Sequence, residues 1–186
     1  FLDRTNTPSC PNPPLQTPAM ASMKNLILSF TTLAISICAT HAAPIKVVTS
    51  VSDLADFTRI IGAESVHVSS LATGKEDPHS VPLKPSMITR LQEADLFIIM
   101  GLDMEHAYAG ALQQESRNLK IRRGAPGFLD LSSHIQPLEI PDSLNRMNGE
   151  VHPNGNPHYN LDPVNAQIMV GQIAKKLSEL EPTQAK

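Results

Sequence analysis

Apolar residues from position 45 onward alternate between short β-branched runs and longer stretches with helical spacing. Runs typical of buried strands occupy residues 45–51, 66–71 and 96–100. Between the first two runs, the spacing predicts a helix from Ser52 to Gly62. The residues expected to face the core from this helix are Leu54, Phe57, Ile60 and Ile61. A strand, a helix and a strand in this order favour a parallel βαβ unit.

A second alternating unit follows the first. Pro85 suits the first turn of a helix that precedes the run at 96–100. Another helix is expected over about 104–115, followed by short extended pieces at 120–122 and 127–131. The sequence therefore predicts the α/β class, with a Rossmann-like lobe built on a parallel sheet of about four strands and flanking helices.

Residues 134–160 break this pattern, because they contain four Pro, two Gly and five Asn with almost no apolar periodicity. Such a composition is typical of a long loop. Asp162 followed by Pro163 then predicts a helix start, which combines an N-cap with a first-turn proline. The apolar positions of this last helix recur at spacings of three and four, at Ala166, Val170, Ile173, Leu177 and Leu180. Part of the cover for this stripe is expected to be missing, because the chain ends soon afterwards.

The first 42 residues are predicted to lie outside the folded lobe. Residues 1–22 begin without Met and are rich in Pro, so they are interpreted as a disordered or spurious leader. Residues 23–42 have the basic start, apolar run and small residues of a secretory signal peptide. Because Ile37 precedes Cys38 where lipoproteins have a small residue, cleavage after Ala42 is favoured over lipid anchoring. The expected location is the periplasm.

Composition and charge narrow the chemistry. With 15 basic and 18 acidic residues, and no basic cluster, the chain lacks the electrostatic features of nucleic-acid binding. Both cysteines, Cys10 and Cys38, precede the predicted cleavage site, so neither a disulfide nor a thiolate metal site is expected. The sequence has no nucleophile elbow, no HExxH and no glycine-rich phosphate loop, so an enzyme is not predicted. A transition-metal site would use His with Asp or Glu.

Two histidines stand out from the other four of the mature chain. His79 ends the triplet Asp77-Pro78-His79 directly after a predicted strand, and His158 ends a similar Asn-Pro-His triplet shortly before a predicted helix. The proline limits the backbone freedom of each turn, and turns beyond the carboxyl ends of parallel strands form ligand crevices. His79 and His158 are therefore candidate metal ligands. The other four, for which a solvated or packed side chain is expected, are His67, His106, His134 and His152.

These segments resemble a known family. Four segments are similar, in order and spacing, to the zinc/manganese solute-binding proteins of ABC transporters. They are KVVTSVSDLADFTRIIG, the stretch from VHVSSLATGKEDPHS to LFIIMG, LDME and GNPHYNLDPVNAQ. The resemblance runs from about 45 to 182. It implies an N-terminal α/β lobe that one rigid helix joins to a second lobe, with the metal between them. It also implies that His79 and His158 are the two ligands of the first lobe.

The resemblance also divides the chain. It implies a metal-binding lobe at 43–162 and an inter-lobe helix at 163–181, and it indicates that the second lobe is absent together with the third and fourth ligands. The expected function is an extracytoplasmic receptor that captures a divalent metal, with Zn²⁺ favoured, and delivers it to the membrane permease of an ABC transporter. A monomer is expected. The alternatives are a Mn²⁺ receptor, since the third ligand decides the metal, and a surface adhesin-like protein of the same family.

The long loop supplies auxiliary metal candidates. His134 lies near its start and His152 near its end, with Glu139, Asp142 and Glu150 between them. One hypothesis is that the loop holds metal transiently and passes it to His158, because it raises the local metal concentration. The alternative is a solvated loop whose two histidines do nothing. Extra histidines in the loop favour zinc over manganese.

Overall fold

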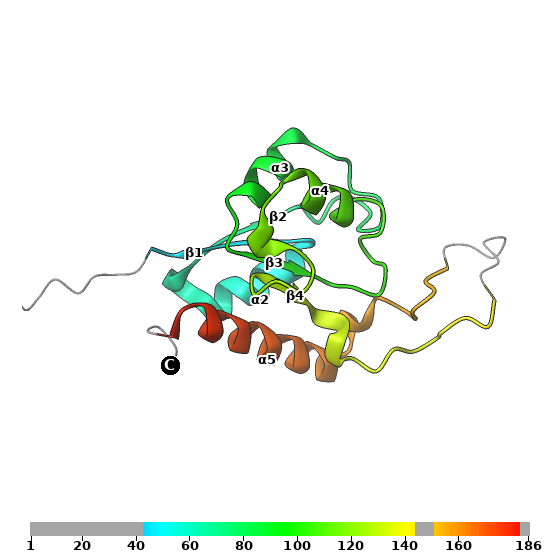
Figure 1. Ribbon diagram of the computed structural model, residues 1–186. Helices are drawn as coiled ribbons and strands as arrows, with labels where there is room; N and C mark the ends of the chain where they lie inside the picture. The colour runs from blue at the N-terminus through cyan, green and yellow to red at the C-terminus, as the bar shows by residue number, and fades with distance from the viewer. Residues whose placement is uncertain (1–42, 144–150, 183–186) are drawn as a thin grey trace, which may run out of the picture. The chain divides into compact units, whose positions relative to one another are not determined.

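A four-stranded parallel sheet forms the centre of the lobe (Figure 1). The computed structural model describes residues 43–143 and 151–182, and the leader and signal peptide predicted at 1–22 and 23–42 lie outside these residues. In spatial order the strands are β2 (Val66–Ser70), β1 (Ile45–Thr49), β3 (Leu96–Ile99) and β4 (Phe128–Asp130), and each neighbouring pair is parallel. The predicted α/β lobe with about four parallel strands is confirmed.

The two strands at the centre of the sheet are the most buried, and burial is complete in β3. β1 pairs with β2 from Ile45 opposite Val66, and it pairs with β3 on its other side from Val47 opposite Leu96. All four residues of β3 are buried. Strands that are covered on both faces have no solvent side, so apolar residues follow one another without alternation.

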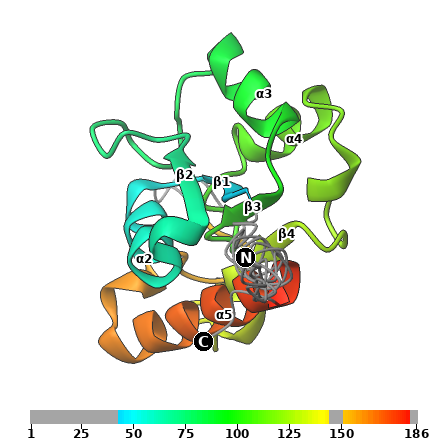
Figure 2. The ribbon, with the colours of Figure 1, turned by 90° about the vertical axis from the view of Figure 1, so that its left-hand side faces the viewer.

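Helices cover both faces of the sheet. α2 (Ser52–Gly62) and α5 (Pro163–Leu180) lie side by side on one face, and α3 (Pro85–Gln92) and α4 (Ala109–Glu115) lie on the other (Figures 1 and 2). The predicted start of α5 is confirmed, because Asp162 Oδ1 accepts a hydrogen bond from the backbone N of Val164 at 2.9 Å. Among the described helices, none combines the length and the apolar character that crossing a bilayer requires.

The chain turns after β3, so the helix predicted at 104–115 is shorter than expected and begins only with α4. Three consecutive residues, 101–103, have positive φ angles of 85°, 49° and 64°. The buried carboxylate of Glu105 then accepts hydrogen bonds from the backbone N of Met100 at 2.7 Å and of Gly101 at 3.1 Å. These contacts hold the chain in turns where helical periodicity alone predicts a helix.

Two smaller predictions are also wrong. The piece expected to be extended at 120–122 overlaps a short 3₁₀ helix, Leu119–Ile121, because Asn118 Oδ1 accepts a hydrogen bond from the backbone N of Lys120 at 3.0 Å. Ile60 was expected to face the core but is 80% exposed. The core-facing side of α2 is narrower than the apolar spacing suggests, and its buried residues are Leu54, Ala55 and Thr58.

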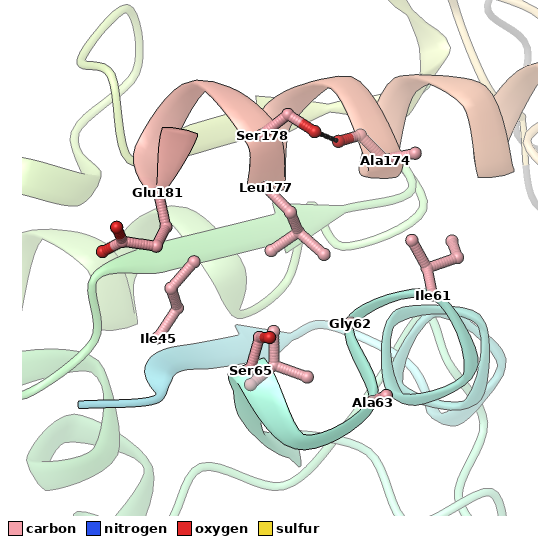
Figure 3. Close-up of a pocket in the computed structure, with 10 residues that line it drawn as sticks. Ile45, Ile61, Gly62, Ala63, Ser65, Ala174, Leu177, Ser178 and Glu181 are labelled. Atoms are coloured by element: carbon pink, nitrogen blue, oxygen red, sulfur yellow. Dashed lines mark hydrogen bonds between the residues drawn. The ribbon is translucent and has the colours of Figure 1, made fainter. Parts of the chain in front are cut away.

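A cavity of about 220 Å³ lies at the amino ends of β1 and β2. Figure 3 shows Leu177 of α5 pointing toward Ile45 and the end of α2, while the Ser178 hydroxyl donates a hydrogen bond to Ala174 O at 2.9 Å. This cavity is at the opposite end of the strands from the two histidine turns. It therefore does not belong to the candidate metal centre.

Candidate metal centre

Two turns with the same hydrogen bond present His79 and His158. Asp77 Oδ1 accepts a hydrogen bond from the backbone N of His79 at 2.9 Å, and Asn156 Oδ1 accepts one from the backbone N of His158 at 2.9 Å. Both are Asx turns, in which a side-chain oxygen takes the place of a backbone carbonyl. The intervening proline restricts φ in each turn. The residue two positions before each histidine therefore fixes its backbone.

The two predicted ligands are adjacent in space although they are 79 positions apart. Their Nε2 atoms lie 3.3 Å from each other, and their ring planes meet at 72° with centroids 5.2 Å apart. His79 is 8% exposed, whereas His158 lies at the surface. The first turn follows β2 and the second precedes α5. The pair thus lies beyond the carboxyl end of the sheet, where doubly wound folds bind ligands.

A cavity of about 350 Å³ adjoins this pair, and His152 and Glu139 also line it. The ring centroid of His152 is 4.7 Å from that of His79 and 6.3 Å from that of His158. Three imidazoles therefore lie around one cavity. Within residues 43–143 and 151–182, no three His, Asp or Glu side chains are arranged to surround a single metal ion. The two predicted ligands that the structure brings into contact are His79 and His158.

His134, the other auxiliary candidate, lies elsewhere. It ends the short 3₁₀ helix Leu131–His134, and its Nδ1 is 3.1 Å from Gln172 Oε1 on α5. Glu150 falls outside the described residues. Of the two auxiliary histidines, His152 alone lines the cavity beside the predicted ligands.

Two carboxylates, those of Glu76 and Asp77, give the turn that ends at His79 a negative charge. The hydrogen bond from the backbone N of His79 lowers the pKa of Asp77, and the Ser80 hydroxyl contributes in the same direction. The hydroxyl and the backbone N of Thr73 donate to Glu76 Oε2 at 2.7 and 2.9 Å, and they lower the pKa of Glu76 to about 2. Ionised carboxylates near the histidines favour the approach of a cation.

The two arms of the long loop are joined where they leave the lobe on the same side (Figure 1). The backbone N of Asn156 donates to Leu138 O at 2.8 Å, and the side-chain Nδ2 of Asn156 donates to Glu139 Oε2 at 2.7 Å. Asn154 Nδ2 donates to Asp103 Oδ2, in the turn after β3, at 2.8 Å. These bonds hold the arm that carries His152 against the lobe.

The roles of Asp77 and Asn156 were missed by reasoning from sequence, which considered only the histidines and prolines. A signal was available, because Asp or Asn two residues before the histidine is the Asx-turn pattern. The contact between the Asn156 side chain and the ring of His158 has no corresponding pattern in the sequence. Asn156 Oδ1 also lies 2.9 Å from the ring Nδ1 of His158, which depends on the rotamers of both side chains.

Comparison with known proteins extends this picture. Residues 47–186 match the family described as "Zinc-uptake complex component A periplasmic", or ZnuA. The manganese ABC transporter substrate-binding lipoprotein PsaA of Streptococcus pneumoniae serotype 4 is 26% identical over 143 residues, which are 77% of this chain and 44% of that protein.

Solved structures share the fold of the lobe. A zinc-bound deletion mutant of ZnuA superposes with a TM-score of 0.62 at 29% identity, over 76% of this chain and 49% of that one. The cadmium-bound periplasmic metal binding protein from Candidatus Liberibacter asiaticus gives a TM-score of 0.60 at 28% identity, over 75% and 46%. The chain spans about half the length of the curated relatives it matches, between 42% and 51%.

Proposed function

Because the chain belongs to the ZnuA family of periplasmic zinc-uptake components, we propose that it is the metal-binding lobe of an extracytoplasmic receptor that captures a divalent metal for an ABC transporter. The observation that carries this proposal is the 3.3 Å between Nε2 of His79 and Nε2 of His158. Two imidazole nitrogens bound to one tetrahedral zinc at about 2.0–2.1 Å lie about 3.3–3.4 Å apart. The two side chains are therefore spaced to share one ion.

Zinc is the proposed cargo. The paired donors are both imidazoles, and His152 adds a third imidazole beside them. Imidazole suits Zn²⁺, whereas carboxylate and carbonyl oxygens suit Mn²⁺. Manganese is the alternative, because the name of the streptococcal relative specifies that metal. The third ligand would decide between the two ions.

Isothermal titration calorimetry with zinc tests the site. Two ligands leave two positions of a four-coordinate site unfilled, so weak binding is expected. His79→Ala and His158→Ala should each weaken it strongly, because either change removes one of the two paired imidazoles. His67→Ala is the matched control, since His67 is an exposed residue of β2 and should leave the titration unchanged. Tight binding that His79→Ala does not weaken would contradict the proposed ligands, and stronger binding of manganese would favour the alternative metal.

The proposed partner is the membrane permease of an ABC transporter, and the proposed form of the receptor is a monomer in the periplasm. The names of relatives as transporter substrate-binding components support this role, which is that of a transport receptor and not of an enzyme. Lipid anchoring at Cys38 and an adhesin-like role at the cell surface are the alternatives. Release of the protein by osmotic shock would support the periplasmic receptor, and retention in the membrane fraction would support an anchor.

Transfer of metal from the long loop is proposed to run through His152. What supports this is the 4.7 Å between the ring centroids of His152 and His79, whereas His134 contacts Gln172. His152→Ala should slow zinc loading in a stopped-flow experiment at limiting zinc. His134→Ala is the comparison and should load as fast as the unmodified chain. Equal rates for all three proteins would make the loop a connector only.

A further inference from the structure

The side-chain amide of Asn156 has its orientation set by two neighbours. Its Oδ1 lies 2.9 Å from the backbone N of His158, and because a backbone N–H can only donate, the facing atom must be an oxygen. On its other side, Nδ2 donates to Glu139 Oε2 at 2.7 Å, and an ionised carboxylate can only accept. Both partners require the same amide orientation.

This orientation determines where the proton of His158 lies. The same Oδ1 of Asn156 is 2.9 Å from the ring Nδ1 of His158, so Nδ1 must carry a hydrogen to donate. A neutral imidazole has one N–H, which leaves the lone pair on Nε2. That Nε2 is the atom that faces His79 at 3.3 Å.

We infer that Asn156, oriented by Glu139, is a positioning residue that selects the metal-binding tautomer of His158 before metal arrives. The inference rests on the proposed function, because it assigns a role to the lone pair on Nε2. A ligating imidazole that donates its other N–H to a protein oxygen is held in orientation and is a more basic ligand. In the turn at His79, the second oxygen of Asp77 accepts a hydrogen bond from the Ser80 hydroxyl at 3.3 Å.

The tautomer can be read directly in the metal-free protein. Two-bond ¹H–¹⁵N correlation spectra of the ¹⁵N-labelled chain, recorded where the imidazoles are neutral, show which ring nitrogen of His158 carries the hydrogen. We expect Nδ1–H in the unmodified chain, Nε2–H in Asn156→Ala, and Nδ1–H again in Asn156→Asp, which keeps the accepting oxygen. Asn160→Ala is the control, because Asn160 donates to Asp53 and should leave the His158 tautomer unchanged.

Zinc titrations of the same proteins give the second measurement. Asn156→Ala should bind zinc about 10–100-fold more weakly, Asn156→Asp should recover most of that loss, and Asn160→Ala should bind like the unmodified chain. Circular dichroism checks that each variant is folded. If Asn156→Ala does not fold, the tautomer of the unmodified chain and of Asn156→Asp decides the matter.

Two results would overturn the inference: Nε2–H in the unmodified chain or in folded Asn156→Asp, or an Asn156→Ala variant with unchanged tautomer and affinity. Failure of the proposed function looks different, because the unmodified chain would then show no zinc binding that depends on His158. The tautomer measurement needs no metal and would still give its own answer.

Discussion

Replacing Gly101 by alanine should destabilise the lobe by about 3 kcal/mol, from two local costs. Gly101 follows β3 with φ at +85°, a conformation that costs an L side chain about 1–2 kcal/mol. An added Cβ would also overlap Asp130 Oδ1 and lie 2.5 Å from Ser132 Oγ. Both contacts are closer than van der Waals distance, so the neighbours must move.

Movement of those neighbours breaks a local hydrogen-bonded turn. Asp130 Oδ1 accepts from the backbone N of Ser132 at 3.1 Å and from its hydroxyl at 2.6 Å. Each lost hydrogen bond costs about 0.5–1.5 kcal/mol, so together with the backbone term the sum is about 2–5 kcal/mol. Domains of this size are stable by about 5–15 kcal/mol. The substitution should therefore remove a large fraction of the total stability.

Urea denaturation followed by far-UV circular dichroism measures the effect as a change in the free energy of unfolding. The matched control is Gly110→Ala in α4, where an added Cβ has no neighbour within 4 Å. Alanine is the better helix former, so this control should gain about 0.5–1 kcal/mol. If Gly101→Ala unfolds at the same urea concentration as the unmodified chain, the close approach at the end of β3 does not constrain the fold as argued.

Three further results are expected. Ile173→Ala should lower the free energy of unfolding by about 2–5 kcal/mol, because Ile173 of α5 is fully buried; Ile168→Ala, at a residue 36% exposed, should cost far less in the same urea series. Burial raises the pKa of Glu105, so its contribution to stability is present below the unfolded pKa and declines as pH rises through the folded pKa. Urea denaturation at several pH values should show this decline in the free energy of unfolding, and Glu105→Gln should not show it. Thr73→Ala removes the hydroxyl hydrogen bond to Glu76 and should raise its pKa from about 2 in an NMR titration, whereas an unchanged pKa would assign the shift to other contacts.

The strands and the last helix could be predicted because their local signals agree with their surroundings. β3 is buried on both faces and is an unbroken apolar run, and β1 is buried at every residue except Lys46. α5 begins at an Asp-Pro pair whose capping bond is present in the structure. Within α5, however, the expected stripe included Val170, which is 36% exposed, and omitted Met169, which is fully buried. Helical spacing permits both sets, and packing against α2 and the sheet selects one of them.

The candidate ligands could be identified individually from their turns, whereas their meeting was implied only by the family resemblance. His79 and His158 occupy turns of the same type, but the local sequence around each histidine does not predict that their Nε2 atoms lie 3.3 Å apart. That distance depends on the strand order β2-β1-β3-β4 and on where the chain re-enters before α5. The contact between Asn156 and the ring of His158 depends further on two rotamers. The periodicity and spacing of residues in the sequence predict neither the distance between the two Nε2 atoms nor the rotamers of Asn156 and His158.

Because the two arms of the long loop are joined at its base, a change in the length of the loop need not change the geometry of the candidate metal centre. The backbone hydrogen bond from Asn156 N to Leu138 O keeps the two arms together beside His158. The arms also approach closely at Gly155, whose φ is 107° and where an added Cβ would lie 2.8 Å from Leu138 O. Beyond such a junction, each doubling of loop length costs only about 0.6 kcal/mol in closure entropy. Insertions and deletions between the arms are therefore among the least costly changes open to evolution or to a protein engineer near this site. A peptide that binds a different cation could be grafted there while the turn that holds His158 stays as it is.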